Sequence, residues 1–237
     1  MQNLLTIVVP TYNEEYYIVD TLFDIIKQVG SKGVKIIIAD AGSTDRTVEC
    51  CNEIKNAFDL NLEIIKGGLP SVGRNNGAKL ATTPYVLFLD ADVKFTSDTA
   101  IRKALTHLVF LGYHMVSTTP VYKGEPDWRA TLMFIINKYV TMAMSKIRPF
   151  AIGGFTMVYK PFFDGIGGYN EEVKQAEDWL LSSQVAPSKF KLITGLMTQD
   201  NRRFKKYGYL NMIKLIRRNW LNRNNLDYFK EDQGYWD

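Results

Sequence analysis

The chain has 237 residues, a length that suits one large domain or two halves that share a core. Hydrophobic residues make up 46% of the sequence and charged residues 23%, which excludes a disordered or a collagen-like chain. The net charge of +4 is mildly basic and does not by itself indicate a nucleic-acid-binding protein.

Over the first 95 residues, short apolar runs alternate with segments whose apolar residues fall at helical spacing. The apolar runs predict strands at residues 5–9, 34–39, 62–65 and 85–89. The helical segments lie at residues 14–29, from residue 43 onwards, and at residues 71–80. This alternation predicts an α/β fold in which helices cover both faces of a mostly parallel sheet.

The rest of the chain is less regular. Its apolar spacing predicts a strand at residues 115–119 and helices at residues 97–111, 128–144 and 177–185. Two glycine pairs, Gly153–Gly154 and Gly167–Gly168, indicate loops or close approaches of the backbone. The apolar segment from Phe134 to Met144 could rest on a membrane or pack within the protein, and we expect it to lie in the core.

Nothing in the sequence indicates a signal peptide or a membrane span. The N-terminus runs directly into the first predicted strand, and no stretch reaches the roughly 18 apolar residues that cross a bilayer. Neighbouring cysteines such as Cys50 and Cys51 rarely form a disulfide, because the geometry is strained. We therefore expect a cytoplasmic protein with two buried or half-buried thiols on a helix.

Polar residues directly after the predicted strands are the first candidates for a binding site. In sheets of this kind, ligands bind beyond the carboxyl ends of the strands. The polar residues at these ends form three groups, Thr11–Glu14, Asp40–Ser43 and Asp90–Asp92.

Asp90 and Asp92 follow a buried strand and are separated by one residue. Two carboxylates so placed repel each other unless a cation lies between them. Their hard oxygens suit Mg²⁺ or Mn²⁺, which could bridge to a diphosphate and stabilise it as a leaving group. A pair of loop acids that cap the next helix would show the same pattern, so the residues alone leave both interpretations open.

Asp40 and Arg74 are candidate contacts to a nucleotide. Asp40 could accept a hydrogen bond from a base or a ribose hydroxyl. Arg74 lies in a glycine-rich helix start, where backbone amides and a guanidinium suit a diphosphate. The alternatives are a turn aspartate and a solvated arginine. No dinucleotide-binding GxGxxG motif and no P-loop motif occurs.

Two adjacent acids, Glu177 and Asp178, precede an apolar run in the second half. One of them could act as the general base for a hydroxyl group. Acids at the start of a helix are also favoured by its dipole, so a purely structural role is the alternative. The two histidines, His107 and His114, lie in no pattern typical of a triad or a zinc site and are expected to be structural.

Taken in order, these motifs resemble family 2 of the inverting glycosyltransferases, enzymes with a GT-A fold. The resemblance spans residues 4 to about 185, and it rests on the order of the motifs because each of them alone is weak. The motifs are Val8–Glu14, Asp40–Thr47, Gly73–Gly77, Leu89–Asp92, Gly153–Gly154, Gly167–Glu171 and Glu177–Asp178.

The resemblance implies a role for each matched residue of the nucleotide-binding half. Pro10, Tyr12 and Glu14 would line the nucleotide pocket. Asp40 would bind the base, which is usually uracil in this family, and Arg74 would approach the diphosphate. This chain has Asp40–Ala41 where the family usually has two acids, so contacts to the base are expected to be fewer.

The resemblance also assigns the metal site and the base. Asp92 would ligate Mn²⁺ or Mg²⁺ directly, and Asp90 would contact the ribose or the water shell of the metal. Asp178 would be the catalytic base, with Glu177 beside it. Inversion needs the base and the leaving diphosphate on opposite sides of the sugar, which agrees with acids in both halves of the chain. Whether Gln199 or Asp200 completes the metal shell stays open.

Residues 1–95 would thus form a nucleotide-sugar-binding half and residues 96–200 an acceptor-binding and catalytic-base half of one GT-A domain. Residues 201–237 would form a basic tail. The implied reaction moves a sugar from a nucleotide-diphosphate sugar, usually a UDP-sugar, to a hydroxyl of a glycan or lipid-linked acceptor of the cell envelope. The Gln-X-X-Arg-Trp motif of processive synthases is absent after Asp178, so one sugar is expected per encounter.

Two other functions would account for parts of this pattern. A sugar-phosphate nucleotidyltransferase on a similar sheet would carry a glycine-rich, basic loop after the first strand, and here that loop is Thr11–Glu14. A non-catalytic module that binds a nucleotide or nucleic acid through the basic tail leaves the acids at the strand ends unexplained. We therefore expect no nucleic-acid partner.

The basic tail has nine lysines and arginines and one acid, Asp227, between Arg202 and Lys230. We expect its first cations to close over the diphosphate, namely Arg202, Arg203, Lys205 and Lys206. Further along, four apolar residues fall near one face of a helix, Leu210, Ile213, Ile216 and Trp220. This helix could rest on the inner face of an anionic membrane or pack on the domain, and the sequence leaves both open.

Overall fold

The computed structural model describes residues 1–231, apart from the side chain of Arg203. One sheet of eight strands runs through the chain in the order β3-β2-β1-β4-β7-β6-β8-β5. The strands are β1 (Leu5–Thr11), β2 (Lys35–Asp40), β3 (Leu62–Lys66), β4 (Tyr85–Leu89), β5 (Lys94–Phe95), β6 (Met115–Tyr122), β7 (Phe155–Tyr159) and β8 (Phe190–Gln199).

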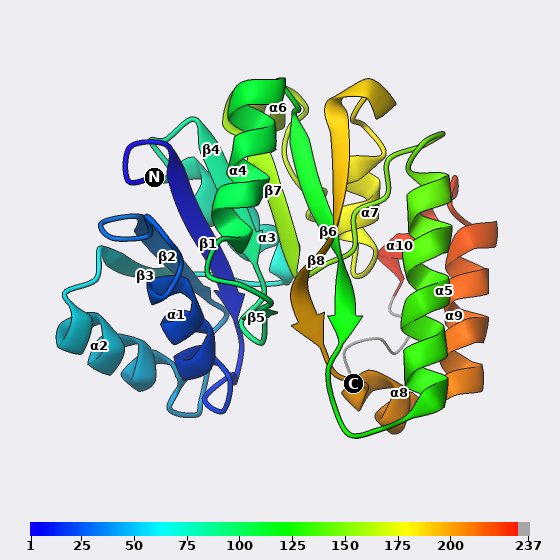
Figure 1. Cartoon of the computed structure of the whole chain (residues 1–237), viewed down its shortest axis with the longest axis horizontal. Coiled ribbons are helices and arrows are strands. Elements are labelled where there is room, and N and C mark those ends of the chain that lie inside the picture. Colours follow the sequence, from blue (N-terminus) through cyan, green and yellow to red (C-terminus); the bar gives the residue numbers. More distant parts are fainter. Residues whose placement is uncertain (232–237) are drawn as a thin grey trace.

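The helices surround this sheet (Figure 1). In the first half they are α1 (Ile18–Ile26), α2 (Thr47–Phe58), α3 (Pro70–Lys79) and α4 (Ala100–Leu111). In the second half they are α5 (Trp128–Met144), α6 (Lys160–Gly165), α7 (Glu177–Ser182), α8 (Arg202–Tyr207), α9 (Tyr209–Leu221) and α10 (Leu226–Lys230). Within residues 1–231, no helix is both long and apolar enough to cross a bilayer.

The α/β fold predicted from the sequence is confirmed. The four neighbouring strands β3, β2, β1 and β4 are all parallel to one another, and β6 and β8 are parallel to each other as well. Strand β7 runs antiparallel between β4 and β6, and it joins the two halves into one sheet. The carboxyl ends of β1, β2 and β4 therefore meet at one edge, where the loops carry the acids.

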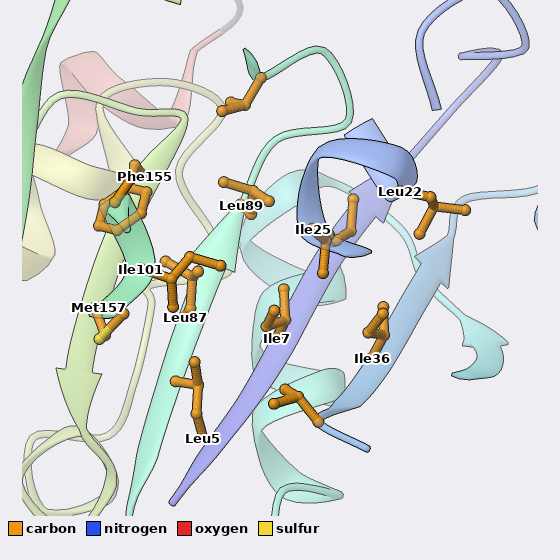
Figure 2. Close-up of a cluster of buried hydrophobic side chains, with 14 of the residues drawn as sticks. Leu5, Ile7, Leu22, Ile25, Ile36, Leu87, Leu89, Ile101, Phe155 and Met157 are labelled. Atoms are coloured by element: carbon orange, nitrogen blue, oxygen red, sulfur yellow. The ribbon is translucent and has the colours of Figure 1, made fainter. Parts of the chain in front are cut away.

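Alternate residues of the buried strands supply two apolar layers, because successive side chains of a strand point to opposite faces. Leu5, Ile7 and Val9 of β1 pack with helices α1, α2 and α4, whereas Val8 packs with α3 and α6 on the other face. Figure 2 shows part of the first layer, in which Leu22 and Ile25 of α1 cover β1 and β2. Cys50 and Cys51 of α2 are buried free thiols, as expected.

The expectation that residues 134–144 lie in the core is wrong for most of that segment. The predicted helix forms, but it packs through one side only, on which Phe134 and Thr141 are buried. Ile136 and Tyr139 on the other side keep 47% and 62% of their surface exposed. The apolar residues of α5 are spread around its axis, so its sequence does not reveal which side meets the protein.

A close approach of the backbone shapes the edge of the sheet near Asp40. A Cβ atom added at Gly67 would overlap the carbonyl oxygen of Ala39, well inside van der Waals contact. The amide of Gly67 donates to the carbonyl of Asp40 at 2.6 Å, so the two chain segments cannot simply separate.

We therefore predict that Gly67→Ala lowers the free energy of unfolding by about 1–3 kcal/mol, as overpacking does elsewhere. Urea denaturation followed by circular dichroism measures this change. Gly165→Ala is the matched control, since an added Cβ atom there meets nothing within 4 Å. Equal stability of the two variants would contradict the prediction.

Candidate active site

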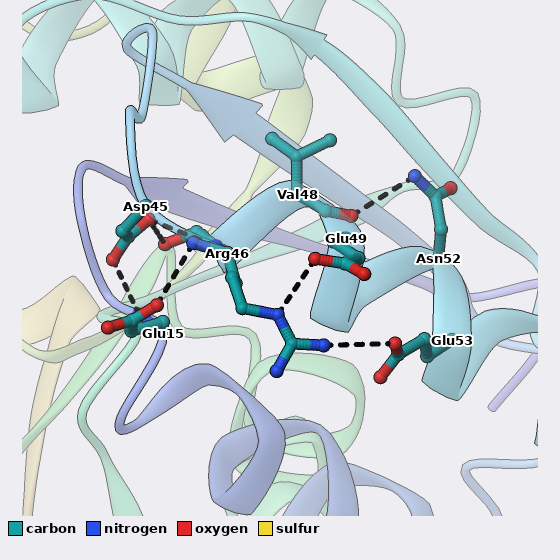
Figure 3. Close-up of polar contacts among 8 residues, drawn as sticks. Glu15, Asp45, Arg46, Val48, Glu49, Asn52 and Glu53 are labelled. Carbon is teal, nitrogen blue, oxygen red and sulfur yellow. Dashed lines mark hydrogen bonds and ion pairs between the residues drawn. The ribbon is translucent and has the colours of Figure 1, made fainter.

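The loops after β1 and β2 are bonded to each other and form one unit at the edge of the sheet. The amide of Asn13 donates to Ser43 Oγ at 2.9 Å, and the amide of Thr44 donates to Asn13 Oδ1 at 2.9 Å. Glu15 and Asp45 continue the link, and Figure 3 shows Glu15 accepting from the backbone of Arg46. These bonds place the predicted nucleotide-binding residues on a rigid frame.

Asp40 is held within this frame. Its Oδ1 accepts from Thr11 Oγ1 and Ser43 Oγ at 2.9 and 2.6 Å, and its Oδ2 accepts from the amides of Gly42 and Ser43. Burial alone would raise the pKa of Asp40, but the hydrogen bonds from Ser43, Thr11 and Gly42 hold it below its ordinary value. Asp40 is thus ionised and shapes the loop after β2. Its contact with a base stays a prediction.

The other predicted pocket residues lie beside this loop. Pro10 pairs with Ala39 in the sheet, and the side chain of Tyr12 is 60% exposed. Glu14 faces the acids after β4. Burial, together with the charges of Asp92 and Asp90, raises the pKa of Glu14 to about 7. The site therefore has an excess of negative charge on this side.

Arg74 connects the acids of the two halves. Its side chain is almost fully buried, its Nη2 lies 2.7 Å from Asp90 Oδ1, and its Nη1 lies 2.8 Å from Glu177 Oε1. The same Nη1 lies 3.7 Å from Asp178 Oδ2. The structure thus brings together four of the residues predicted from the sequence. Contact of Arg74 with a diphosphate stays a prediction, because its guanidinium is engaged by carboxylates here.

Asp178 is a buried carboxylate near the start of α7. Its Oδ1 accepts from the hydroxyl of Tyr169 at 3.0 Å, and its Oδ2 faces Gly153, where an added Cβ atom would lie 2.9 Å away. Burial raises the pKa of Asp178 to about 7, although Arg74 and the Tyr169 hydroxyl lower it. Near neutral pH this group can both lose and take up a proton, as a general base must.

Asn75 holds Tyr169 in place from the neighbouring position of α3. Its Nδ2 donates to the carbonyl of Tyr169 and its Oδ1 accepts from the Tyr169 amide, both at 2.9 Å. The sequence motifs contained both residues, but sequence reasoning gave neither a role. The sequence does show Asn75 beside Arg74, and it shows Tyr169 directly after the glycine pair Gly167–Gly168. Their contact depends on the fold, because 94 residues separate them.

Asp92 lies against the start of the basic tail. Its Oδ2 is 2.6 Å from Nη2 of Arg202, and Nε of Arg202 is 2.7 Å from Asp200. The guanidinium of Arg202 also lies over the ring of Tyr17, at 4.2 Å from its centroid. Of the other cations expected at the diphosphate, Lys205 pairs with Glu125, and the side chain of Arg203 lies outside the described residues.

Within residues 1–231, no three acidic, histidine or cysteine side chains are grouped so that they could hold a metal by themselves. Asp92 and Asp90 keep 35% and 32% of their side-chain surfaces exposed, and both add to the negative charge around Glu14. Mg²⁺ commonly takes one or two carboxylates together with waters and substrate phosphates. The residues present fit a cation that a diphosphate helps to hold.

The chain is similar to proteins of known family. The profile of Glycosyl transferase family 2 matches residues 6–167. Over 95% of its length, the chain is 24% identical to the minor teichoic acid biosynthesis protein GgaA of Bacillus subtilis, and it covers 52% of that protein. Over 41% of its length, it is 32% identical to the poly(ribitol-phosphate) beta-glucosyltransferase of Bacillus spizizenii, of which it covers 16%. The chain thus spans about half or less of these relatives.

Two solved structures share the fold. The mannosyltransferase PcManGT of Pyrobaculum calidifontis, in complex with GDP-Man and Mn²⁺, aligns with a TM-score of 0.66 and 22% identity over 82% of this chain and 55% of that one. TarS 1–349 of S. aureus, in complex with UDP-GlcNAc, aligns with a TM-score of 0.63 and 21% identity over 84% and 59% of the two chains. Because the family profile covers more than half of the sequence, the chain belongs to glycosyl transferase family 2 and is a glycosyltransferase with a GT-A fold.

Proposed function

We propose that this glycosyltransferase moves one sugar at a time, with inversion, from a UDP-sugar to a hydroxyl of its acceptor, and that it uses Mn²⁺ or Mg²⁺. The observation that carries the proposal is the position of Asp178. This buried carboxylate lies 3.7 Å from Nη1 of Arg74, and Asp90 lies 2.7 Å from Nη2, so a candidate base and a candidate leaving-group contact are separate acids of one site. In the proposed reaction the base and the departing diphosphate lie on opposite sides of the sugar, because the nucleophile enters opposite the leaving group.

In this proposal, Oδ2 of Asp178 takes the proton of the acceptor hydroxyl while the hydroxyl oxygen attacks the anomeric carbon of the donor sugar. The assignment to Oδ2 rests on the bond between Oδ1 and Tyr169, which occupies the other oxygen. It also rests on Gly153, because any side chain at that position would lie against Oδ2. Arg74 holds Asp90 and Glu177 by ion pairs and so fixes the separation of the two acidic sites.

The donor would lie over the frame formed by the loops after β1 and β2. Tyr12, Pro10 and Asp40 would line the nucleotide there. A divalent cation held by Asp92, with Asp90 in its outer shell, would neutralise charge on the diphosphate as it leaves. Arg202 already neutralises Asp92 in the structure and would contribute its charge to the same site.

The names of the relatives support a proposal for the acceptor. Several of them are described as acting on poly(ribitol-phosphate) or in teichoic acid biosynthesis. We propose that this chain transfers its sugar to a hydroxyl of such a polyol phosphate polymer or of another lipid-linked glycan of the cell envelope. The proposal includes a peripheral contact of the basic tail with the inner face of the membrane, where such acceptors are found.

Asp178→Asn should lower the rate of transfer by about 10²- to 10⁴-fold, because the amide cannot accept the proton. Donor affinity should be unchanged, since Asp178 is not among the residues proposed to contact the nucleotide. A screen of UDP-sugars by thermal shift selects the donor, and product formation then gives the rate. Asp164→Asn, an exposed acid paired with Lys160, is the control. Transfer at the wild-type rate by Asp178→Asn would refute the assignment of the base.

The pH profile tests the role of Tyr169. A base with a pKa of about 7 gives kcat/KM a limb that rises with pH around neutrality, because only the ionised form accepts a proton. Tyr169→Phe removes a hydrogen bond that lowers the pKa of Asp178, so the limb should move to higher pH. The rate above the limb should be largely kept. Tyr159→Phe, at the end of β7, is the control, and a limb that stays in place in Tyr169→Phe would argue against this role.

Chelation tests the metal. In the wild type, EDTA should weaken donor binding on the order of tenfold, a typical coupling between two ligands that share a site. Asp92→Ala should bind the donor weakly with or without Mn²⁺, because the direct ligand is gone. Isothermal titration calorimetry measures both affinities, and Asp98→Ala, an exposed acid downstream of β4, serves as the control. Donor affinity in Asp92→Ala that still depends on Mn²⁺ would contradict the ligand assignment.

A further inference from the structure

Helices α5 and α9 leave an unusual amount of apolar surface uncovered. Eleven large apolar side chains on these helices keep 43–74% of their surface exposed. We call them the two-helix surface; they are Trp128, Leu132, Ile135, Ile136, Tyr139, Val140, Leu210, Ile213, Ile216, Trp220 and Leu221. Exposed apolar residues that are scattered need no explanation, but a group of this size on neighbouring helices indicates a binding surface.

The two helices are held side by side at both ends. At their starts, the hydroxyl of Tyr209 donates to Asp127 at 2.5 Å, and the guanidinium of Arg129 lies over the Tyr209 ring. At their other ends, Arg148 donates to Asn224 at 3.2 Å. The helices therefore run in the same direction, next to each other along one side of the molecule, as Figure 1 shows.

This region is basic as well as apolar. Residues 128–144 and 209–221 contain no aspartate or glutamate, and they contain five cations, Arg129, Lys138, Lys214, Arg217 and Arg218. Lys214, Arg217 and Arg218 line a hollow on α9 together with Asn211 and Leu221. These three cations form no ion pair with any residue that the structure describes.

This combination of residues selects the partner. In a symmetric dimer the same patch would meet its own copy, so the unpaired cations of both copies would face each other. The cores of protein interfaces are also depleted of charge. A bilayer surface that carries anionic lipids meets both properties, because apolar side chains enter the acyl boundary while lysines and arginines reach the phosphates.

We propose that the two-helix surface rests on an anionic phospholipid bilayer, with α5 supplying apolar contact and α9 supplying both apolar contact and charge. The inference extends the part of the proposed function that places the basic tail at a membrane. It adds α5, which the sequence assigned to the core, and it makes docking a property of two helices that are fixed to each other.

The same surface is connected to the active site through α8. Arg202 of α8 contacts Asp92, whereas Phe204 packs against Phe134 of α5 and stacks on Tyr209 of α9. Docking on a bilayer would therefore place the donor site at a fixed height above the lipid headgroups, where a lipid-linked acceptor is within reach.

Sedimentation of the full chain with vesicles tests the proposal, and it needs no donor. The wild type should bind vesicles of phosphatidylcholine and phosphatidylglycerol, release them at high salt, and bind pure phosphatidylcholine weakly. Replacing Lys214, Arg217 and Arg218 by glutamine should lower the partition coefficient on the order of a hundredfold, at about fivefold per cation. Replacing Leu132, Ile136 and Tyr139 of α5 by glutamine should lower it at least tenfold.

Helix α4 offers the matched controls. Phe110 and Leu111 are 78% and 62% exposed, and Arg102 and Lys103 are exposed cations of the same helix. Glutamine at each of these pairs should leave vesicle binding at the wild-type level. Thermal unfolding of every variant verifies the fold, which these exposed substitutions should preserve.

Three results would overturn the proposal. The first is that the α5 variant binds vesicles as tightly as the wild type. The second is that the wild type binds neutral and anionic vesicles equally. The third is that the wild type binds no vesicles but forms a dimer in light scattering, and that the α5 variant does not form this dimer. The last result would assign the surface to a second copy of the chain. Sugar transfer to a soluble acceptor is measured separately. Vesicle binding without sugar transfer would refute the proposed reaction but would not contradict the proposed membrane-binding role of the two-helix surface.

Discussion

The ion pairs of Arg74 are the interaction on which the arrangement of this molecule depends. One guanidinium, buried in α3, neutralises Asp90 from the first half and Glu177 from the second half, and it lies close to Asp178. Removing one partner from a buried ion pair costs about 3–5 kcal/mol, because a charge is left without compensation. The two halves of the sheet must therefore meet as they do for the charges to be balanced. The ion pairs of Arg74 and the apolar layers thus favour the same arrangement of the two halves.

Around these ion pairs, neighbouring residues of α3 have different roles. Arg74 binds the carboxylates, Asn75 holds the backbone of Tyr169, and Gly77 allows α3 to lie directly against Val8 of β1. The same short helix thus positions the acids, the tyrosine that bonds to Asp178, and its own contact with the sheet. Such a concentration of roles explains why this segment contains so many small and polar residues within a buried helix.

The sequence predicted the first half of the fold well because its strands are buried on both faces and rich in β-branched residues, a pattern with few alternatives. It did not reveal β7 or β8. Strand β8 is interrupted by Gly195, which has a positive φ of 74°, and its pairing with β6 shifts register, so its side chains follow no simple alternation. In the site, the acids at the strand ends could be predicted from topology. The bonds from Arg74 to Glu177 and from Arg202 to Asp92 could not, because they join residues 103 and 110 positions apart.

Helix α8 has a consequence of its own. It is six residues long, and it carries Arg202 against Asp92 at one end of a short path and Phe204 between α5 and α9 at the other. A ligand that displaces α8 together with Arg202 also shifts the aromatic stack around Phe204. Thermodynamic linkage is reciprocal, so whatever holds that stack in place changes the affinity for the ligand by the same factor. Helix α8 thus connects the active site to the helices α5 and α9 and to any partner that binds them.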